Sequence, residues 1–324
     1  MRDISNVTVL MTVYNGAEYV SRAIHSILIQ TYKEFQFLII DDGSTDNTKE
    51  VIHSFKDPRI NYHYIPNSGL GTALNYGLGI AKYDWIARMD ADDISHPQRL
   101  EKQIMIAVRN DFDVISCQYA VFEEERIRYV ILSSEHHPDI KKRLAIHNEI
   151  SHPGVLFNRQ TIINSGGYYP GVFEDFELWL RIKDRVKFYI LPEVLIFLNL
   201  RMNSYSRTDS ELRRKEVYDI LAPYYNSDLT KEFGIKQEEN NIIRGWREFI
   251  YGDKIKAREY WSSTPFNYLG LRILTAYMLT FFPTNFILKF QKCNLRFRIN
   301  YLISYFYRHN RSLRRTFFGL INIS

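Results

Sequence analysis

The chain has 324 residues, of which 45% are hydrophobic and 24% charged. This length and balance are typical of a folded globular protein and allow one large domain with an appendage, or two domains. The only cysteines, Cys117 and Cys293, lie far apart, which predicts neither a disulfide framework nor a zinc site and favours a reducing compartment. No signal peptide is predicted, because Met1 is followed closely by a strand-like run.

The formal net charge of +5 is unevenly distributed along the chain. From Tyr260 to Ser324 there are nine Lys and Arg and no Asp or Glu, so the first 259 residues carry a net charge of about −4. This polarity points to an acidic or neutral body with a basic tail.

The first ninety residues alternate strand-like and helix-like segments. A β-branched run at Val7–Val13 precedes helical spacing of apolar residues over 17–30, and three further apolar runs follow, each separated by a helical pattern: Phe35–Ile40, Ile60–Ile65 and Trp85–Met89. This repeated order predicts an α/β fold with a mainly parallel, Rossmann-like sheet flanked by helices.

Two of these strands end in aspartates. Asp41 and Asp42 follow the second strand, and Asp90, Asp92 and Asp93 follow the fourth. Because the carboxyl ends of parallel strands lie at one edge of a sheet, these acids are expected to converge on one crevice. Clustered carboxylates favour a hard divalent cation such as Mg²⁺ or Mn²⁺, which would in turn hold phosphates. The alternative is an acidic loop whose aspartates cap a helix.

The glycine-punctuated segment Asn67–Gly79 does not match a nucleotide-phosphate loop. The third glycine of the dinucleotide fingerprint is replaced by Leu74, and no Gly-Lys-Ser/Thr occurs. These glycines are therefore interpreted as loop and helix-packing positions.

Beyond Pro97 the sequence predicts a helix to about Val108, a strand near 113–121 and a further strand at Ser151–Phe157, which contains His152. Residues 123–137 are polar and are expected to form a loop. Adjacent acids Glu174 and Asp175 open an amphipathic helix, where they either serve chemistry or only complement the helix dipole.

Five motifs in this order resemble the family 2 glycosyltransferases over about residues 5–208: Val9–Asn15, Ile40–Asp46, Asn67–Gly77, Asp90–Asp93, and Gly166-Gly167-Tyr168 followed by 174–181. The resemblance implies a GT-A fold and an inverting transfer of a sugar from a nucleotide diphosphate sugar. The expected donor is a UDP-sugar. It implies a cytoplasmic enzyme of surface-polysaccharide, lipopolysaccharide or capsule synthesis.

The resemblance also implies roles for particular residues. Thr12, Asp41, Asp42 and Asp90 correspond to nucleotide-binding positions, with Asp41 on the base. Asp92 corresponds to the position that holds the metal and diphosphate. A second set concerns the transfer itself: Asp175 corresponds to the general base, and Glu174, His152 and Arg201 are further candidates. Arg201 stands near a position where relatives carry a histidine close to the diphosphate; the alternative is a surface arginine.

The resemblance and the charge pattern together divide the chain. Residues 1–208 are expected to form the catalytic domain, with a nucleotide-sugar half over about 1–95 and an acceptor half over about 96–208. Residues 209–324 are expected to form a helical C-terminal appendage whose basic, aromatic tail spans 260–324.

The tail is the basis for the expected partners besides the donor and a glycan or lipid-linked acceptor. The thirteen Phe and Tyr and nine basic residues between Tyr268 and Ser324 fit helices that lie on an anionic membrane surface, at the inner face of the cytoplasmic membrane. The alternative is a helical subdomain packed on the enzyme or on a second copy. Nucleic acid binding is not expected. A nucleotidyltransferase and a non-catalytic scaffold on the same fold are the alternative functions; measurement of donor hydrolysis would separate the scaffold from an enzyme.

Overall fold

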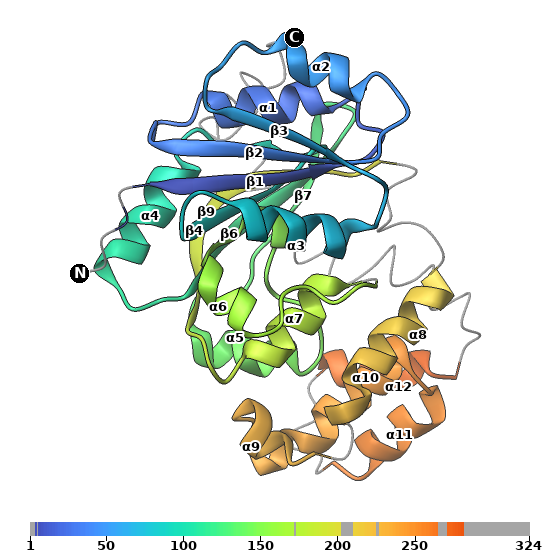
Figure 1. Ribbon diagram of the computed structural model, residues 1–324. Coiled ribbons are helices and arrows are strands. Elements are labelled where there is room, and N and C mark those ends of the chain that lie inside the picture. The colour runs from blue at the N-terminus through green and yellow to red at the C-terminus, as the bar shows by residue number, and fades with distance from the viewer. Residues whose placement is uncertain are drawn as a thin grey trace. The chain divides into compact units, whose positions relative to one another are not determined.

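The computed structural model describes residues 4, 6–171, 173–201, 210–224, 227–264 and 271–281 (Figure 1). Their contacts divide into two compact units. The first holds the described residues up to His137 and those of Ile150–Arg201, and the second holds Pro138–Glu149 and the described residues between 210 and 281. The domain boundary expected at residue 208 falls among residues 202–209, outside the described residues.

The first unit is built on one sheet. Within the described residues this sheet has nine strands in the order β3-β2-β1-β4-β8-β6-β9-β5, with β7 paired to β6. The strands are β1 (Val7–Val13), β2 (Phe35–Asp42), β3 (Ile60–Ile65), β4 (Trp85–Asp90), β5 (Ile94–Ser95), β6 (Val114–Glu123), β7 (Arg126–Ile131), β8 (Leu156–Asn158) and β9 (Phe188–Asn199).

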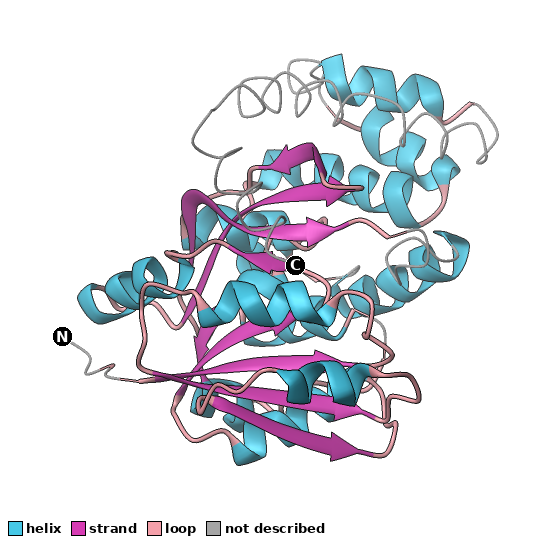
Figure 2. Ribbon diagram, turned by 90° about the horizontal axis from the view of Figure 1, so that it is seen from above, coloured by secondary structure: helices cyan, strands magenta, loops and turns pink. Residues whose placement is uncertain are grey.

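The first four strands are parallel, as the alternating pattern predicts. β1 pairs with both β2 and β4, and β3 pairs with β2. Their carboxyl ends therefore lie at one edge, and Figure 2 shows neighbouring arrows that point in a common direction. The polarity then changes, because β8 runs antiparallel to both β4 and β6, whereas β6 and β9 are parallel. The predicted α/β fold is confirmed, with a mixed rather than uniform second half.

Helices cover both faces of the sheet (Figure 1). Val9 and Met11 of β1 face a core shared with α1 and α4, whereas Leu10 faces α3. This follows from the alternation of side chains along a buried strand. The helices of this unit are α1 (Val20–Leu28), α2 (Thr48–Ser54), α3 (Leu70–Ile80), α4 (Arg99–Arg109), α6 (Arg159–Asn164) and α7 (Glu174–Ile182).

Two segments differ from the sequence expectation. The polar stretch 123–137 is not one loop, because β7 pairs with β6 after a tight turn in which Glu124 and Glu125 have positive φ. The predicted strand at Ser151–Phe157 begins instead with a 3₁₀ turn, η1 (His152–Gly154), and only β8 is extended. Pro153 explains the turn, since proline cannot donate a ladder hydrogen bond.

The second unit is helical in its described residues. Phe249, Ala257, Trp261, Ile273 and Ala276 form its buried core, and the Trp246 and Trp261 rings meet edge to face. Its helices are the greater part of α5 (His137–Leu144), and α8 (Ser210–Leu221), α9 (Leu229–Phe233), α10 (Asn240–Tyr251), α11 (Lys254–Ser262) and α12 (Leu271–Leu279), with short 3₁₀ turns η2 (Ala222–Tyr224) and η3 (Gln237–Glu239).

The tail that the sequence assigns to 260–324 is described only in part. Residues 260–264 complete α11 and its end, and 271–281 carry α12; most of the tail's basic residues lie outside the described residues. In the part of the chain that the structure covers, no helix is both long and apolar enough to cross a bilayer.

Glycines allow α3 to approach both the sheet and a later turn. A methyl group at Gly77 would overlap Leu10 on β1 and come within 3.3 Å of Ile40, and one at Gly71 would lie 2.8 Å from the Tyr169 carbonyl oxygen. The interpretation of these two residues as packing positions is therefore confirmed. By contrast, Gly79 of the same helix has no atom within 4 Å of such a methyl group.

We expect Gly77→Ala to lower the free energy of unfolding by about 1–3 kcal/mol, because the added methyl overpacks a fully buried contact. Gly79→Ala is the matched control. It should raise the free energy of unfolding by up to about 1 kcal/mol, since alanine favours the helix over glycine and the position is open. Urea titration measures both. Equal effects of the two substitutions would contradict the close approach.

Candidate active site

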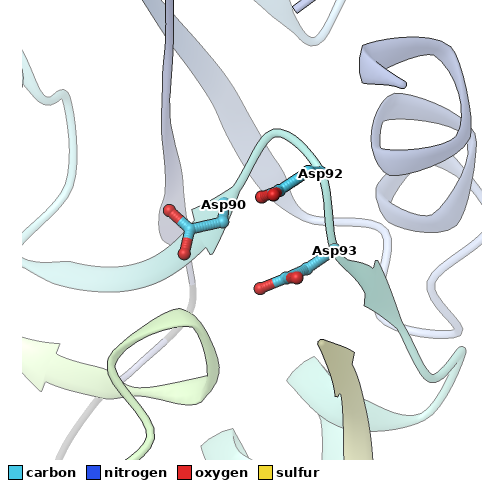
Figure 3. Close-up of side chains that lie close together, drawn as sticks. All are labelled: Asp90, Asp92 and Asp93. Carbon is cyan, nitrogen blue, oxygen red and sulfur yellow. The ribbon is translucent and has the colours of Figure 1, made fainter. Parts of the chain in front are cut away.

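Three aspartates gather where β4 ends. Asp90 is the last residue of β4, and Asp92 and Asp93 follow on the turn that leads to β5; their side chains extend toward the side on which Asp90 lies (Figure 3). One carboxylate oxygen from each lies within 4.8 Å of the others. The turn that follows β4 brings Asp92 and Asp93, two and three residues after Asp90, to the same side of the sheet edge.

Each of these aspartates has a protein partner. Asp90 pairs with Arg88 at 2.5 Å, and Asp92 pairs with Arg201, whose Nε and Nη2 both lie 2.7 Å from the same oxygen. Asp93 accepts a hydrogen bond from the Asn199 amide at 2.9 Å. Arg201 thus lies at the acidic cluster, with its guanidinium 4.2 Å from the Tyr19 ring centre, and is not an isolated surface arginine.

Burial and repulsion raise the pKa of two of these aspartates, Asp92 and Asp93. Burial, together with the charge of Asp90, raises the pKa of Asp92, although Arg201 opposes the shift. Burial and both neighbouring aspartates raise the pKa of Asp93 well above its ordinary value. Hard oxygen donors under such repulsion are a suitable ligand set for a divalent cation, so the residues present fit Mg²⁺ or Mn²⁺.

The nucleotide-binding candidates lie on the neighbouring strands. Thr12 of β1 is in register with Asp90 on one side and Ile40 on the other. Asp41 accepts hydrogen bonds from the Ser44 amide and the Tyr62 hydroxyl, both at 2.8 Å. Its carboxylate is thereby fixed at the carboxyl end of β2.

Asp42 holds the loop that precedes α3. It accepts hydrogen bonds from the amide of Ser68 at 2.8 Å and of Gly69 at 3.0 Å. Asp41 and Asp42 are both buried, and their hydrogen-bond partners lie on the loop after β2, on β3 and on the loop before α3. The structure therefore brings Thr12 next to Asp90, whereas Asp41 and Asp42 are hydrogen-bonded to different segments of the chain.

The second acidic group opens α7. Glu174 is buried, and Asp175 is half-buried and accepts from the Phe176 amide at 2.8 Å. Phe173, directly before them, has φ of +60°, a left-handed conformation that is uncommon outside glycine. Burial raises the pKa of Glu174 against the opposing charge of Arg88; burial and Glu174 raise that of Asp175 against the opposing effect of His152.

His152 connects this helix to the Gly166-Gly167-Tyr168 turn. Its Nδ1 lies 3.4 Å from a Glu174 oxygen and its Nε2 lies 2.9 Å from the Tyr168 hydroxyl. Burial and the charge of Arg88 lower the pKa of His152 to about 3, so the ring is neutral near pH 7.

Asn75 of α3 anchors the same turn. Its side chain donates to the Tyr168 carbonyl oxygen at 2.7 Å and accepts from the Tyr168 amide at 2.8 Å. Gly167 has φ of +69°, and a methyl group there would lie 2.5 Å from the Asn75 amide oxygen. The pair of glycines thus serves both the left-handed backbone and the close approach of Asn75.

Arg88 joins the two acidic groups. It is 2% exposed, pairs with Asp90, and acts electrostatically on both Glu174 and Asp175. A buried guanidinium is stable only with such compensation. Its Nε and Nη1 have no hydrogen-bond partner in the structure.

Arg88, Tyr168 and Asn75 were not predicted as site residues. Arg88 did carry a signal, because a charged residue inside the otherwise apolar run Trp85–Met89 must be paired when that strand is buried. Nothing in the sequence distinguishes Asn75 from other polar residues of a helix.

Comparison with known proteins agrees with the predicted family. The model of glycosyl transferase family 2 matches residues 8–164. The chain is 34% identical over 219 residues to the O-antigen biosynthesis glycosyltransferase WbnJ of Escherichia coli, which covers 65% of this chain and 85% of that protein. It is 32% identical over 226 residues to the putative glycosyltransferase EpsE of Bacillus subtilis, which covers 66% of this chain and 78% of that protein.

Solved structures share the fold. Residues 1–349 of S. aureus TarS in complex with UDP-GlcNAc superpose with a TM-score of 0.58 at 16% identity, covering 85% of this chain and 79% of that one. The mannosyltransferase PcManGT of Pyrobaculum calidifontis, in complex with GDP-Man and Mn²⁺, gives 0.56 at 14% identity, covering 97% and 85%.

The parallel strands, the aspartates that end them, the acidic start of α7 and these similarities lead to one conclusion: the chain belongs to glycosyltransferase family 2 and is a glycosyltransferase enzyme.

Proposed function

We propose that the enzyme transfers a sugar from a nucleotide diphosphate sugar, with UDP as the nucleotide, to a hydroxyl of a glycan or lipid-linked acceptor, with inversion, in surface-polysaccharide synthesis. The observation that carries the proposal is that Arg88 pairs with Asp90 of the first acidic group and acts on Glu174 and Asp175 of the second. Donor and acceptor chemistry would thus share one site. UDP-GlcNAc and GDP-Man bound to two structures of the same fold support a nucleotide-sugar donor.

In this mechanism the strand ends bind the donor. Thr12, Asp41, Asp42 and Asp90 are assigned to the nucleoside, and Asp92 is assigned to the metal that holds the diphosphate. A divalent ion bound there would supply positive charge to the departing diphosphate. Arg201, which pairs with Asp92, would bring a second positive charge to the diphosphate.

Asp175 is assigned as the general base. It takes the proton of the acceptor hydroxyl as the acceptor oxygen forms its bond to the anomeric carbon and the bond to the diphosphate breaks. A single displacement of this kind needs one base and no covalent nucleophile. The raised pKa of Asp175 makes it a stronger base than an exposed aspartate.

The membrane assignment rests on sequence charge. We propose that the basic tail holds the enzyme at the inner face of the cytoplasmic membrane, where lipid-linked acceptors lie. Nine basic residues without an acid from Tyr260 onward support attraction to anionic lipid.

Asp92→Ala should abolish turnover and the metal-dependent part of UDP binding, because one hard oxygen ligand is lost beside the diphosphate. Calorimetric titration of UDP with and without Mn²⁺ measures the second effect independently of turnover. Asp84→Ala is the control, since that aspartate is exposed and pairs with Arg159. Metal-dependent UDP binding that survives in Asp92→Ala would show that Asp92 is not the ligand.

Asp175→Asn should lower kcat by at least about 10²-fold and leave donor affinity nearly unchanged, because a general base acts on the acceptor. In the unsubstituted enzyme kcat should fall as the pH drops through a value above the ordinary aspartate pKa of about 4. Glu174→Gln distinguishes the neighbours: an inactive Glu174→Gln beside an active Asp175→Asn would move the base by one residue.

Replacing Arg308, Arg311, Arg314 and Arg315 together by glutamine should release the enzyme from anionic vesicles, since each basic residue near the surface contributes on the order of 1 kcal/mol. Co-sedimentation with phosphatidylserine vesicles at low and high salt measures the effect.

The matched control for the vesicle experiment removes four charges from the first unit, at exposed positions: Lys33, Lys49, Lys56 and Arg109. This control variant should still sediment. If the tail variant and the control bind vesicles equally, the membrane assignment is wrong.

A further inference from the structure

A chain of buried polar contacts ends on the carboxylate next to the proposed base. The Tyr168 hydroxyl meets Nε2 of His152 at 2.9 Å, and Nδ1 of the same ring meets Glu174 at 3.4 Å. Tyr168 is 2%, His152 5% and Glu174 9% exposed. The three side chains come from a glycine turn, from the 3₁₀ turn before β8 and from the start of α7, so their meeting is a product of the tertiary fold.

The contacts allow only a few proton positions. A neutral imidazole carries one N–H, so one ring nitrogen donates and the other accepts. An ionised Glu174 can only accept, which places the ring proton on Nδ1 and requires the Tyr168 O–H to donate to Nε2. Burial raises the pKa of Tyr168 further above its ordinary value, so its proton is available for that bond.

We propose that His152 and Tyr168 are positioning residues for the catalytic carboxylates: Tyr168 donates to Nε2 of His152, which fixes the Nδ1–H tautomer, and Nδ1–H donates to Glu174. Glu174 is thereby held in place as an ionised acceptor, and Asp175 is left to receive the proton of the acceptor hydroxyl. This inference rests on the proposed role of Asp175.

These contacts would give the two adjacent acids different roles, with Glu174 as a fixed ionised acceptor and Asp175 as the base. Two neighbouring carboxylates tend to share one proton, and either could then act as the base. A hydrogen bond to the charged form of Glu174 removes that ambiguity. The negative charge kept on Glu174 then raises the proton affinity of Asp175, in the direction found in the structure.

The anchoring of Tyr168 makes the chain a rigid link. Asn75 holds the Tyr168 backbone by two hydrogen bonds, of 2.7 and 2.8 Å, and Asn75 belongs to α3, which packs on the nucleotide-binding strands. Tyr168 and His152 thus fix the position of Glu174 at the start of α7 relative to α3 and the nucleotide-binding strands.

Tyr168→Phe tests the first contact by removing one hydroxyl and little volume. We expect kcat to fall about tenfold, which is less than the roughly 10²-fold or more that loss of the general base itself costs, with donor affinity unchanged within twofold. Tyr169→Phe is the matched control: its ring is exposed and stacks on Arg181 at 4.2 Å, away from His152. Equal rates for the two phenylalanine variants would overturn the proposal.

Two substitutions of His152 separate positioning from packing. An asparagine amide nitrogen can take the place of Nδ1, whereas a glutamine amide lies nearer the place of Nε2. His152→Asn should therefore retain more kcat than His152→Gln, although glutamine is closer to histidine in volume. A residue that only filled space would give the reverse order, and that result would overturn the assignment.

The tautomer can be observed directly. In ¹⁵N-labelled enzyme the His152 ring signal, identified by its loss in His152→Asn, should report Nδ1–H near pH 7, and the Nδ1–H population should fall in Tyr168→Phe. An Nε2–H ring in the unsubstituted enzyme would overturn the proposal. Failure of this inference can be distinguished from failure of the proposed function. If the Asp175→Asn variant were active, Asp175 would not be the general base, whichever tautomer His152 has.

Discussion

The ion pair between Arg88 and Asp90 is the constraint on which the site depends. Five acids, Asp90, Asp92, Asp93, Glu174 and Asp175, gather at one edge of the sheet, and their repulsion would disperse them without a buried positive charge. Arg88 supplies that charge from within β4, so the strand that presents the first acidic group also compensates the second. Burial, together with the same charge, lowers the pKa of His152 to about 3, so the ring is neutral near pH 7.

Much of the first half of the fold could be predicted because its signals are local. Apolar runs such as Phe35–Ile40 alternate with helical patterns, and parallel pairing then fixes which strand ends meet. This reasoning predicted that Asp41 and Asp90 lie at the carboxyl ends of parallel strands, on the same edge of the sheet, and β1 lies between their two strands. It could not predict that Asp41 accepts from Tyr62 and Asp42 from Ser68, because those contacts depend on where Tyr62 and Ser68 lie in space.

The rule for parallel sheets does not explain how His152, a further candidate from the family resemblance, comes to the site, because the sheet changes polarity. β8 is antiparallel to β4, so the residues that enter β8 lie at the same edge as the residues that leave β4. His152 precedes β8 in the sequence and thus lies at the catalytic edge. The rule for parallel sheets considers only residues that follow a strand in the sequence. Asn75 was missed because its two hydrogen bonds join residues 93 positions apart.

The path of the chain between the two units has a consequence for synthesis. Pro138–Glu149 belongs to the second unit although it is flanked on both sides by the first. Its Ala145 carbonyl accepts a hydrogen bond from the buried Arg247, which is translated 102 residues later. During translation, more than a hundred further residues must therefore be synthesised before Arg247 is available to contact this segment. Ile140 and Leu144, fully buried in the finished protein, are for that interval apolar side chains on a nascent chain and candidates for chaperone binding.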